Sequence, residues 1–68
     1  MTRLTVTMVA PVAPFTMDFA DHSTAQHWLD VIDTGCEAHV KILDETGKTF
    51  AFDTANVVLL TMEDLPNG

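Results

Sequence analysis

Residues 15–36, FTMDFADHSTAQHWLDVIDTGC, contain the change from a strand pattern to a helix pattern that decides the fold. In the first five of these residues apolar and polar side chains alternate, which is the period-2 pattern of a half-buried strand. Further along, apolar side chains recur at the i, i+3, i+4 and i+7 positions and form one stripe along a helix. This apolar stripe consists of Ala25, Trp28, Leu29 and Ile32. The stretch therefore predicts a strand followed by an amphipathic helix that packs on a sheet.

Capping signals predict both ends of this helix. Ser23 is a preferred N-cap residue, and Gln26 three positions later completes a capping box. Gly35 is the residue type that most often ends a helix in the left-handed conformation. With Ser23 at the N-cap, His22 and His27 occupy the two positions that touch in a hydrophobic staple. We therefore expect a helix between Ser23 and Gly35, with the two histidines in contact.

Alternating patterns predict further strands on both sides of the helix. A hairpin turn, DETGK, joins the third strand to the fourth, and its Gly47 suits a positive φ. The order ββαβββ indicates an α+β fold: one antiparallel sheet of about five strands with one helix packed on one face. We expect a single domain over residues 1–62 and a polar C-terminal tail over residues 63–68. The expected strands cover residues 2–10, 15–19, 38–43, 49–53 and 57–62.

The last predicted strand, VVLLTM at residues 57–62, is apolar on both faces. Such a strand is normally central in its sheet and covered on both sides, whereas one helix covers only one side. A chain of 68 residues also buries only roughly 60% of the surface of its unfolded state, and its single cysteine excludes an internal disulfide. We therefore expect a homo-oligomer, a dimer, that covers the outer face of the sheet. The expected interface residues are Leu43, Ala51, Val58 and Leu60.

Charge and hydropathy limit the classes of partner. Ten acidic residues against three basic ones give a net charge of −7, which repels nucleic acid and anionic membrane surfaces. The apolar residues form short runs rather than a membrane span, and no secretory signal pattern is present. We therefore expect a cytoplasmic protein that binds neither nucleic acid nor membrane. An acidic mimic of DNA that occupies a basic groove on another protein is one alternative.

A metal site is weakly indicated. CEAH at residues 36–39 has the spacing of one ligand pair, but a tetrahedral site needs three or four convergent ligands. The helix start and an outward strand position explain the histidines separately, so we expect no cofactor and keep a small metalloprotein as an alternative. The candidate metal ligands are His22, His27, Cys36 and His39.

The sequence does not predict an enzyme. The Ser23 hydroxyl is assigned to the helix cap, and Cys36 follows a helix C-terminus, whose negative potential disfavours a thiolate. A solvated surface explains the acidic pairs, so they are not expected to act as acid–base groups. These pairs are Asp30 with Asp33, Asp44 with Glu45, and Glu63 with Asp64.

In the order ββαβββ, and in the segment GKTFAFDTANVVLLTME at residues 47–63 after a DETG turn, the chain resembles short uncharacterised proteins of actinobacteria and their phages. Its composition, rich in alanine, aspartate and threonine and poor in lysine, is similar to that of proteins from high-GC genomes. For a phage-type protein this resemblance implies an inhibitor of a host protein, and it implies no residue roles.

The leading hypothesis is a small acidic binding module that self-associates through its sheet and occupies a protein partner. The alternative is a protein that binds or sequesters a small ligand at a site on the oligomer interface. Polar groups expected on the outward face of the sheet are its candidate ligand-binding residues. These are Thr5, Thr7, Thr16, His39 and Lys41.

Overall fold

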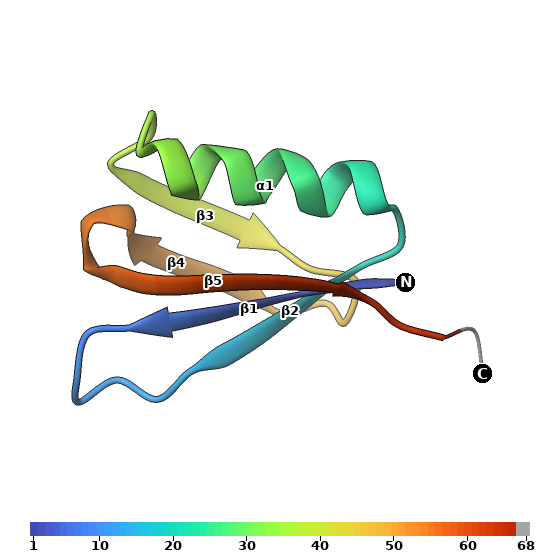
Figure 1. Cartoon of the computed structure of the whole chain (residues 1–68), viewed down its shortest axis with the longest axis horizontal. Coiled ribbons are helices and arrows are strands. Elements are labelled where there is room, and N and C mark those ends of the chain that lie inside the picture. The colour runs from blue at the N-terminus through green and yellow to red at the C-terminus, as the bar shows by residue number, and fades with distance from the viewer. Residues whose placement is uncertain (67–68) are drawn as a thin grey trace.

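The structure is a computed structural model that describes residues 1–66, and it confirms the α+β class and the ββαβββ order (Figure 1). The strands form two antiparallel sheets instead of the expected single sheet: one in the order β2-β1-β5 and a hairpin of β3 with β4. Within the described residues, no helix is both long and apolar enough to cross a membrane. The elements are β1 (Thr2–Met8), β2 (Phe15–Phe19), α1 (His22–Thr34), β3 (His39–Leu43), β4 (Thr49–Asp53), a 3₁₀ turn (Thr54–Asn56) and β5 (Val57–Asp64).

Strand β1 is the centre of the three-stranded sheet. Its Leu4 lies opposite Met17 on β2 and Met62 on β5. Two positions along, its Val6 lies opposite Phe15 on β2 and Leu60 on β5. Because alternate side chains point to opposite faces, this register collects the apolar side chains of all three strands on one face. Leu4, Val6 and Met17 are fully buried there. The apolar residues of the alternating sequence patterns therefore form the inner face of this sheet.

The hairpin shares the same core. Its register places Val40 opposite Phe52 and Ile42 opposite Phe50, so one face of the hairpin is apolar. Phe15 at the start of β2 stacks on Phe50, with ring centroids 5.2 Å apart and planes 8° apart. Such aromatic contacts add to the free energy gained from area burial alone. The hairpin thus packs against β2 through these rings without sharing a strand ladder with it.

Helix α1 covers the inner face of the three-stranded sheet, and Figure 1 shows it running along one side of the strands. The predicted apolar stripe is confirmed: Ala25 and Ile32 are buried, and Trp28 and Leu29 are half-buried against the same core. The predicted helix end is also confirmed. Gly35 has a left-handed φ of 67° and donates its amide to the last turn of the helix at 3.2 Å.

The predicted start of α1 is wrong by two residues. The helix begins at His22, and its N-cap residue is Asp21, whose side chain makes no cap hydrogen bond. The capping box of Ser23 and Gln26 is therefore absent, and Gln26 Nε2 instead donates to the Asp30 carboxylate at 3.0 Å. In this first turn His22 contacts Asp64 of β5. Capping signals describe only neighbouring residues, so they do not predict this contact between distant parts of the chain.

Strand β5 differs from its prediction in position and in length. It is an edge strand paired only with β1, not a central strand. It also extends to Asp64, so Glu63 and Asp64 belong to the strand and not to the expected polar tail. Asn67 and Gly68 of that expected tail lie outside the described residues. This edge strand is therefore eight residues long.

A bulge changes which side chains of β5 point outward. Thr7 of β1 lies opposite Leu59, whereas the next residue of β1 lies opposite Val57, so Val58 is the extra residue. Beyond the bulge, Leu60 lies opposite Val6 on the inner face and is half-buried. The expected placement of Leu60 on the outer face is therefore wrong. Leu59 takes the outward place instead.

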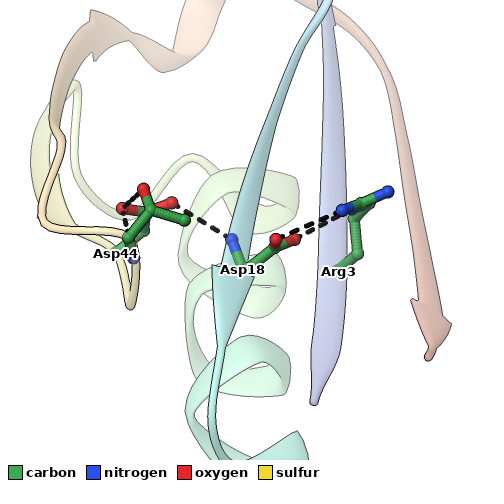
Figure 2. A network of polar contacts seen from close by, with 4 residues as sticks. Arg3, Asp18 and Asp44 are labelled. Carbon is green, nitrogen blue, oxygen red and sulfur yellow. Dashed lines mark hydrogen bonds and ion pairs between the residues drawn. The ribbon is translucent and has the colours of Figure 1, made fainter. Parts of the chain in front are cut away.

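The turn between β3 and β4 is held to β2 through the carboxylate of Asp44, which is only 6% exposed (Figure 2). Its Oδ1 accepts hydrogen bonds from the Thr46 amide at 3.1 Å, the Thr46 hydroxyl at 2.6 Å and the Lys48 amide at 3.1 Å. Its Oδ2 accepts the Asp18 amide at 3.3 Å, and the Glu45 amide donates to the Asp18 carbonyl at 2.7 Å. The expectation that Asp44 belongs to a solvated surface is therefore wrong.

The same polar row continues to β1. Arg3 lies opposite Asp18 in the register, and its Nε and Nη2 atoms donate to the two carboxylate oxygens of Asp18 at 2.9 and 3.2 Å (Figure 2). This two-point hydrogen bonding raises the pKa of the Arg3 guanidinium above its ordinary value. Hydrogen bonds thus run without interruption from the hairpin turn through β2 to β1.

Asp44 makes the stability of this arrangement depend on pH. Burial raises the pKa of its carboxyl, but the hydrogen bonds from the Thr46 hydroxyl and from the three backbone amides outweigh burial and lower it. A carboxyl whose pKa is lower in the folded chain stabilises the fold above its unfolded pKa, about 3.9. That stabilisation is lost as the pH falls through the lower pKa of the folded state.

We expect the substitution Asp44→Asn to lower the free energy of unfolding by about 1–3 kcal/mol near neutral pH, because it removes the charge and replaces one of the two accepting oxygens by an NH2 donor. The variant should also lose part of the acid-dependent decrease in stability seen in the wild type. Urea unfolding measured near neutral pH and at about pH 3 tests both effects. Glu45→Gln is the matched control, since the exposed Glu45 bonds through its backbone. A variant at position 44 as stable as this control would contradict the assignment.

Candidate functional site

A cavity of about 440 Å³ lies between α1 and β3. Strand β3 pairs with β4 along one edge only, and its other edge borders this cavity. Pockets of this size hold small ligands, and their walls are mostly apolar with a few polar groups that orient the ligand. The residues that line it are His27, Trp28, Val31, Cys36, Glu37, His39, Val40 and Lys41.

The apolar wall comes from both elements. Trp28 and Val31 project from the side of α1 that meets β3 and are half-buried, while Val40 is a buried inward residue of β3. The ring of His27 meets that of Trp28 edge-to-face, with centroids 5.1 Å apart and planes 68° apart. An edge-to-face contact is a preferred aromatic geometry and orients both rings. The half-buried indole thus forms part of an aromatic surface on the cavity.

Polar groups of β3 lie at the same cavity. The Nδ1 of His39 lies 2.8 Å from the carboxylate of Asp53, its register partner on β4. Because the imidazole uses Nδ1 in this hydrogen bond, its Nε2 remains available to a ligand. Lys41 lies opposite Ala51 and is exposed. Of the ion pairs found within residues 1–66, none includes Lys41.

The structure brings three of the four candidate metal ligands to this cavity. His27, Cys36 and His39 line it, whereas His22 lies at the other end of α1. In the described part of the chain, no three histidine, cysteine or acidic side chains are placed so that they hold a metal ion. The four predicted ligands therefore do not form one site.

His22 belongs to a separate polar cluster at the end of β5. Its Nδ1 lies 3.0 Å from Asp64 Oδ1, and the hydroxyl of the buried Thr2 donates to the same oxygen at 2.7 Å. Hydrogen bonds from His22 and then Thr2 hold the pKa of the Asp64 carboxyl below its ordinary value. This cluster links the start of the helix to the end of the last strand, which is a structural role.

The predicted ligand-binding residues are divided between the two sheets. Thr5 lies opposite Thr16 on β2 and Thr61 on β5, so these threonines are neighbours on the outer face of the three-stranded sheet. Thr7 lies two positions along the same face. His39 and Lys41 belong to the hairpin and line the cavity beside α1. The predicted set is therefore not one site.

The sequence placed Trp28 in the core stripe, and the apolar residues Trp28, Val31 and Val40 of this cavity belonged to no candidate site. The position of β3 alongside this helix face was not predictable from alternation alone, because the pattern does not say which element borders which edge.

A second candidate surface is the outer part of β5. Val58 is 65% exposed and Leu59 is 56% exposed, beside a hollow of about 340 Å³ between the end of α1 and this strand. Of the other predicted interface residues, Leu43 is 67% exposed and Ala51 is exposed, but both lie on the hairpin. The exposed apolar residues are thus shared between two sheets.

Comparison with known proteins gives no family for this chain. No protein-family model, curated protein or solved structure matches it. The resemblance to short actinobacterial and phage proteins stays a prediction from the sequence. The function is therefore argued from the geometry of the two candidate surfaces.

We expect a nitroxide attached to the exposed thiol of Cys36 to quench the fluorescence of Trp28 strongly in the native protein, because both residues line the same cavity. The control carries the nitroxide at Thr5→Cys in a Cys36→Ser background, on the outer face of the sheet that α1 covers from the inside. Steady-state emission before and after labelling measures the effect. Equal quenching from both positions would contradict the described cavity wall.

Proposed function

We propose that this protein is a small acidic binding module that self-associates through the free edge of β5 and binds a protein partner. The observation that carries the proposal is the state of this edge. Strand β5 is eight residues long, it pairs only with β1, and it exposes the apolar residues Val58 and Leu59. An unpaired strand edge is a template for pairing with another chain.

The direction of the backbone groups on β5 follows from two hydrogen bonds. The Leu65 amide donates to the Met1 carbonyl at 2.8 Å, so odd-numbered residues of β5 beyond the bulge face β1. The same alternation holds on the other side of β1. There the amide and carbonyl of Asp18 on β2 point away from β1 and form hydrogen bonds with the hairpin turn. The amides and carbonyls of Leu60 and Met62 therefore point away from β1 and towards the free edge.

The edge of β5 carries few of the features that prevent pairing. Such edges are commonly protected by lysine, proline or bulges. Residues 57–64, VVLLTMED, contain no lysine or proline, and the bulge lies at the first residues of the strand. The equivalent edge of β2 is different, because the Asp44 turn binds there at Asp18. Of the two outer edges of this sheet, the one on β5 is thus the better template.

Charge favours an antiparallel pair of β5 strands. Glu63 and Asp64 lie at the end of the strand, and the apolar Val57 and Val58 lie at its beginning. A parallel pair would place four carboxylates together, whereas an antiparallel pair places the acidic end of each strand beside the apolar beginning of the other. Antiparallel pairing is also the arrangement that a two-fold homodimer requires of one strand. The proposed dimer therefore has one continuous six-stranded sheet.

The acidic surface supports a basic protein partner. The net charge of −7 gives the chain a negative field that steers association with a positive surface. An inhibitor of a host protein and an acidic mimic of DNA are two forms that such a module takes. Both use the same chemistry, since each places carboxylates in a basic groove of another protein.

We expect the wild-type protein to sediment as a dimer at concentrations on the order of 10 μM, and Leu59→Lys to sediment as a folded monomer. Lysine on a strand edge opposes pairing, and position 59 is exposed, so the single chain tolerates it. Leu43→Lys is the matched control, with the same charge change on an exposed leucine of the hairpin. A monomeric wild type, or dissociation by Leu43→Lys alone, would show that β5 is not the interface.

Binding to a partner is tested by affinity capture from a lysate of the source organism. We expect one basic protein to be retained by the wild type and released as salt rises, because screening weakens electrostatic association. A bait of similar size and neutral charge is the control. Retention of the same proteins by both baits, or of none, would contradict the partner half of the proposal.

A further inference from the structure

The cavity between α1 and β3 has a charge balance that differs from the rest of the chain. Acidic residues outnumber lysine and arginine by ten to three in the whole sequence. The cavity lining contains one acid, Glu37, together with Lys41 and two histidines, His27 and His39. The nearby Asp53 is bound to His39. Nitrogen-bearing groups are therefore concentrated at a cavity whose wall includes the indole of Trp28.

Different residues provide the apolar and the polar parts of this cavity lining. Trp28, Val31 and Val40 provide apolar surface, and the lining also includes Lys41, whose ammonium group takes part in none of the ion pairs of the described residues. His39 adds an oriented ring, because Asp53 holds its Nδ1. An ammonium donor and an imidazole beside an apolar wall match a ligand with an anionic head and an apolar body.

We propose that this cavity binds a small carboxylate with an apolar body. The apolar part packs against Trp28 and Val31, and the carboxylate accepts a hydrogen bond from the Lys41 ammonium. The volume of about 440 Å³ accommodates a chain of about eight carbons. This site shares His39 and Lys41 with the ligand site expected at an oligomer interface, but it needs no second copy, because all of its residues belong to α1, β3 and the loop between them.

The site does not depend on the proposed dimer. Its residues lie on α1 and β3, and the proposed pairing uses the edge of β5. Failure of one proposal therefore leaves the other standing. The monomeric Leu59→Lys variant distinguishes the two, because it should bind the carboxylate as the wild type does.

Octanoate is a suitable probe, because it does not absorb where tryptophan is excited. Titration into the protein while Trp28 emission is recorded should give a saturable change, with a Kd on the order of 1 mM for a ligand this small. Octanamide and octylamine have the same apolar body with a neutral or a positive head. We expect octylamine to bind at least about tenfold more weakly than octanoate.

Lys41→Gln should weaken octanoate binding about tenfold and leave octanamide binding unchanged, because it removes the charge that the carboxylate uses. Lys48→Gln is the matched control, since it removes the same charge from the hairpin turn outside the cavity. Equal affinities for the three probes would mean general apolar adsorption and would overturn the proposal. Absence of saturable octanoate binding, or equal losses in both lysine variants, would also overturn it.

Discussion

The buried carboxylate of Asp44 is the interaction on which the arrangement of the two sheets depends. It organises the turn between β3 and β4 and accepts the outward amide of Asp18 on β2. The hairpin has no strand ladder with the other sheet, so this turn and the Phe15–Phe50 stack hold it in place. Because a buried carboxylate needs several donors, the position of the turn is tightly specified.

Two consequences follow for function. The hairpin turn binds one outer edge of the three-stranded sheet, at β2, and the opposite edge, on β5, has no strand partner among residues 1–66. The hairpin also forms a sheet of its own, and a cavity lies between its strand β3 and α1. The proposed association surface and the proposed ligand site are thus both results of how one hairpin is attached.

Local patterns predicted most of the elements. Period-2 alternation identified the strands, helical spacing identified the buried stripe with Ala25 and Ile32, and Gly35 ended the helix as expected. Each of these features depends on residues close together in the sequence.

The errors concern contacts between distant residues. The helix starts where His22 meets Asp64, 42 residues away. The bulge opposite Thr7 moved Leu60 inward, and a period-2 pattern is displaced by one residue at any bulge. The sequence placed Asp44 on the surface because an acidic residue in a turn is typically exposed to solvent. One of the hydrogen-bond donors to its carboxylate is on β2, far away in the sequence. The cavity was missed for the same reason, since its walls come from two elements whose relative position was unknown.

Amide hydrogen exchange tests the central claim, that the hairpin closes the edge of β2 while a second copy closes the edge of β5. The amides of Leu60 and Met62 point to the free edge, and that of Thr61 points to β1. The account predicts that Leu60 and Met62 are protected at high protein concentration and lose protection on dilution, while Asp18 and Thr61 stay protected throughout. Rapid exchange of Leu60 and Met62 at every concentration, with Asp18 protected, would contradict association through β5.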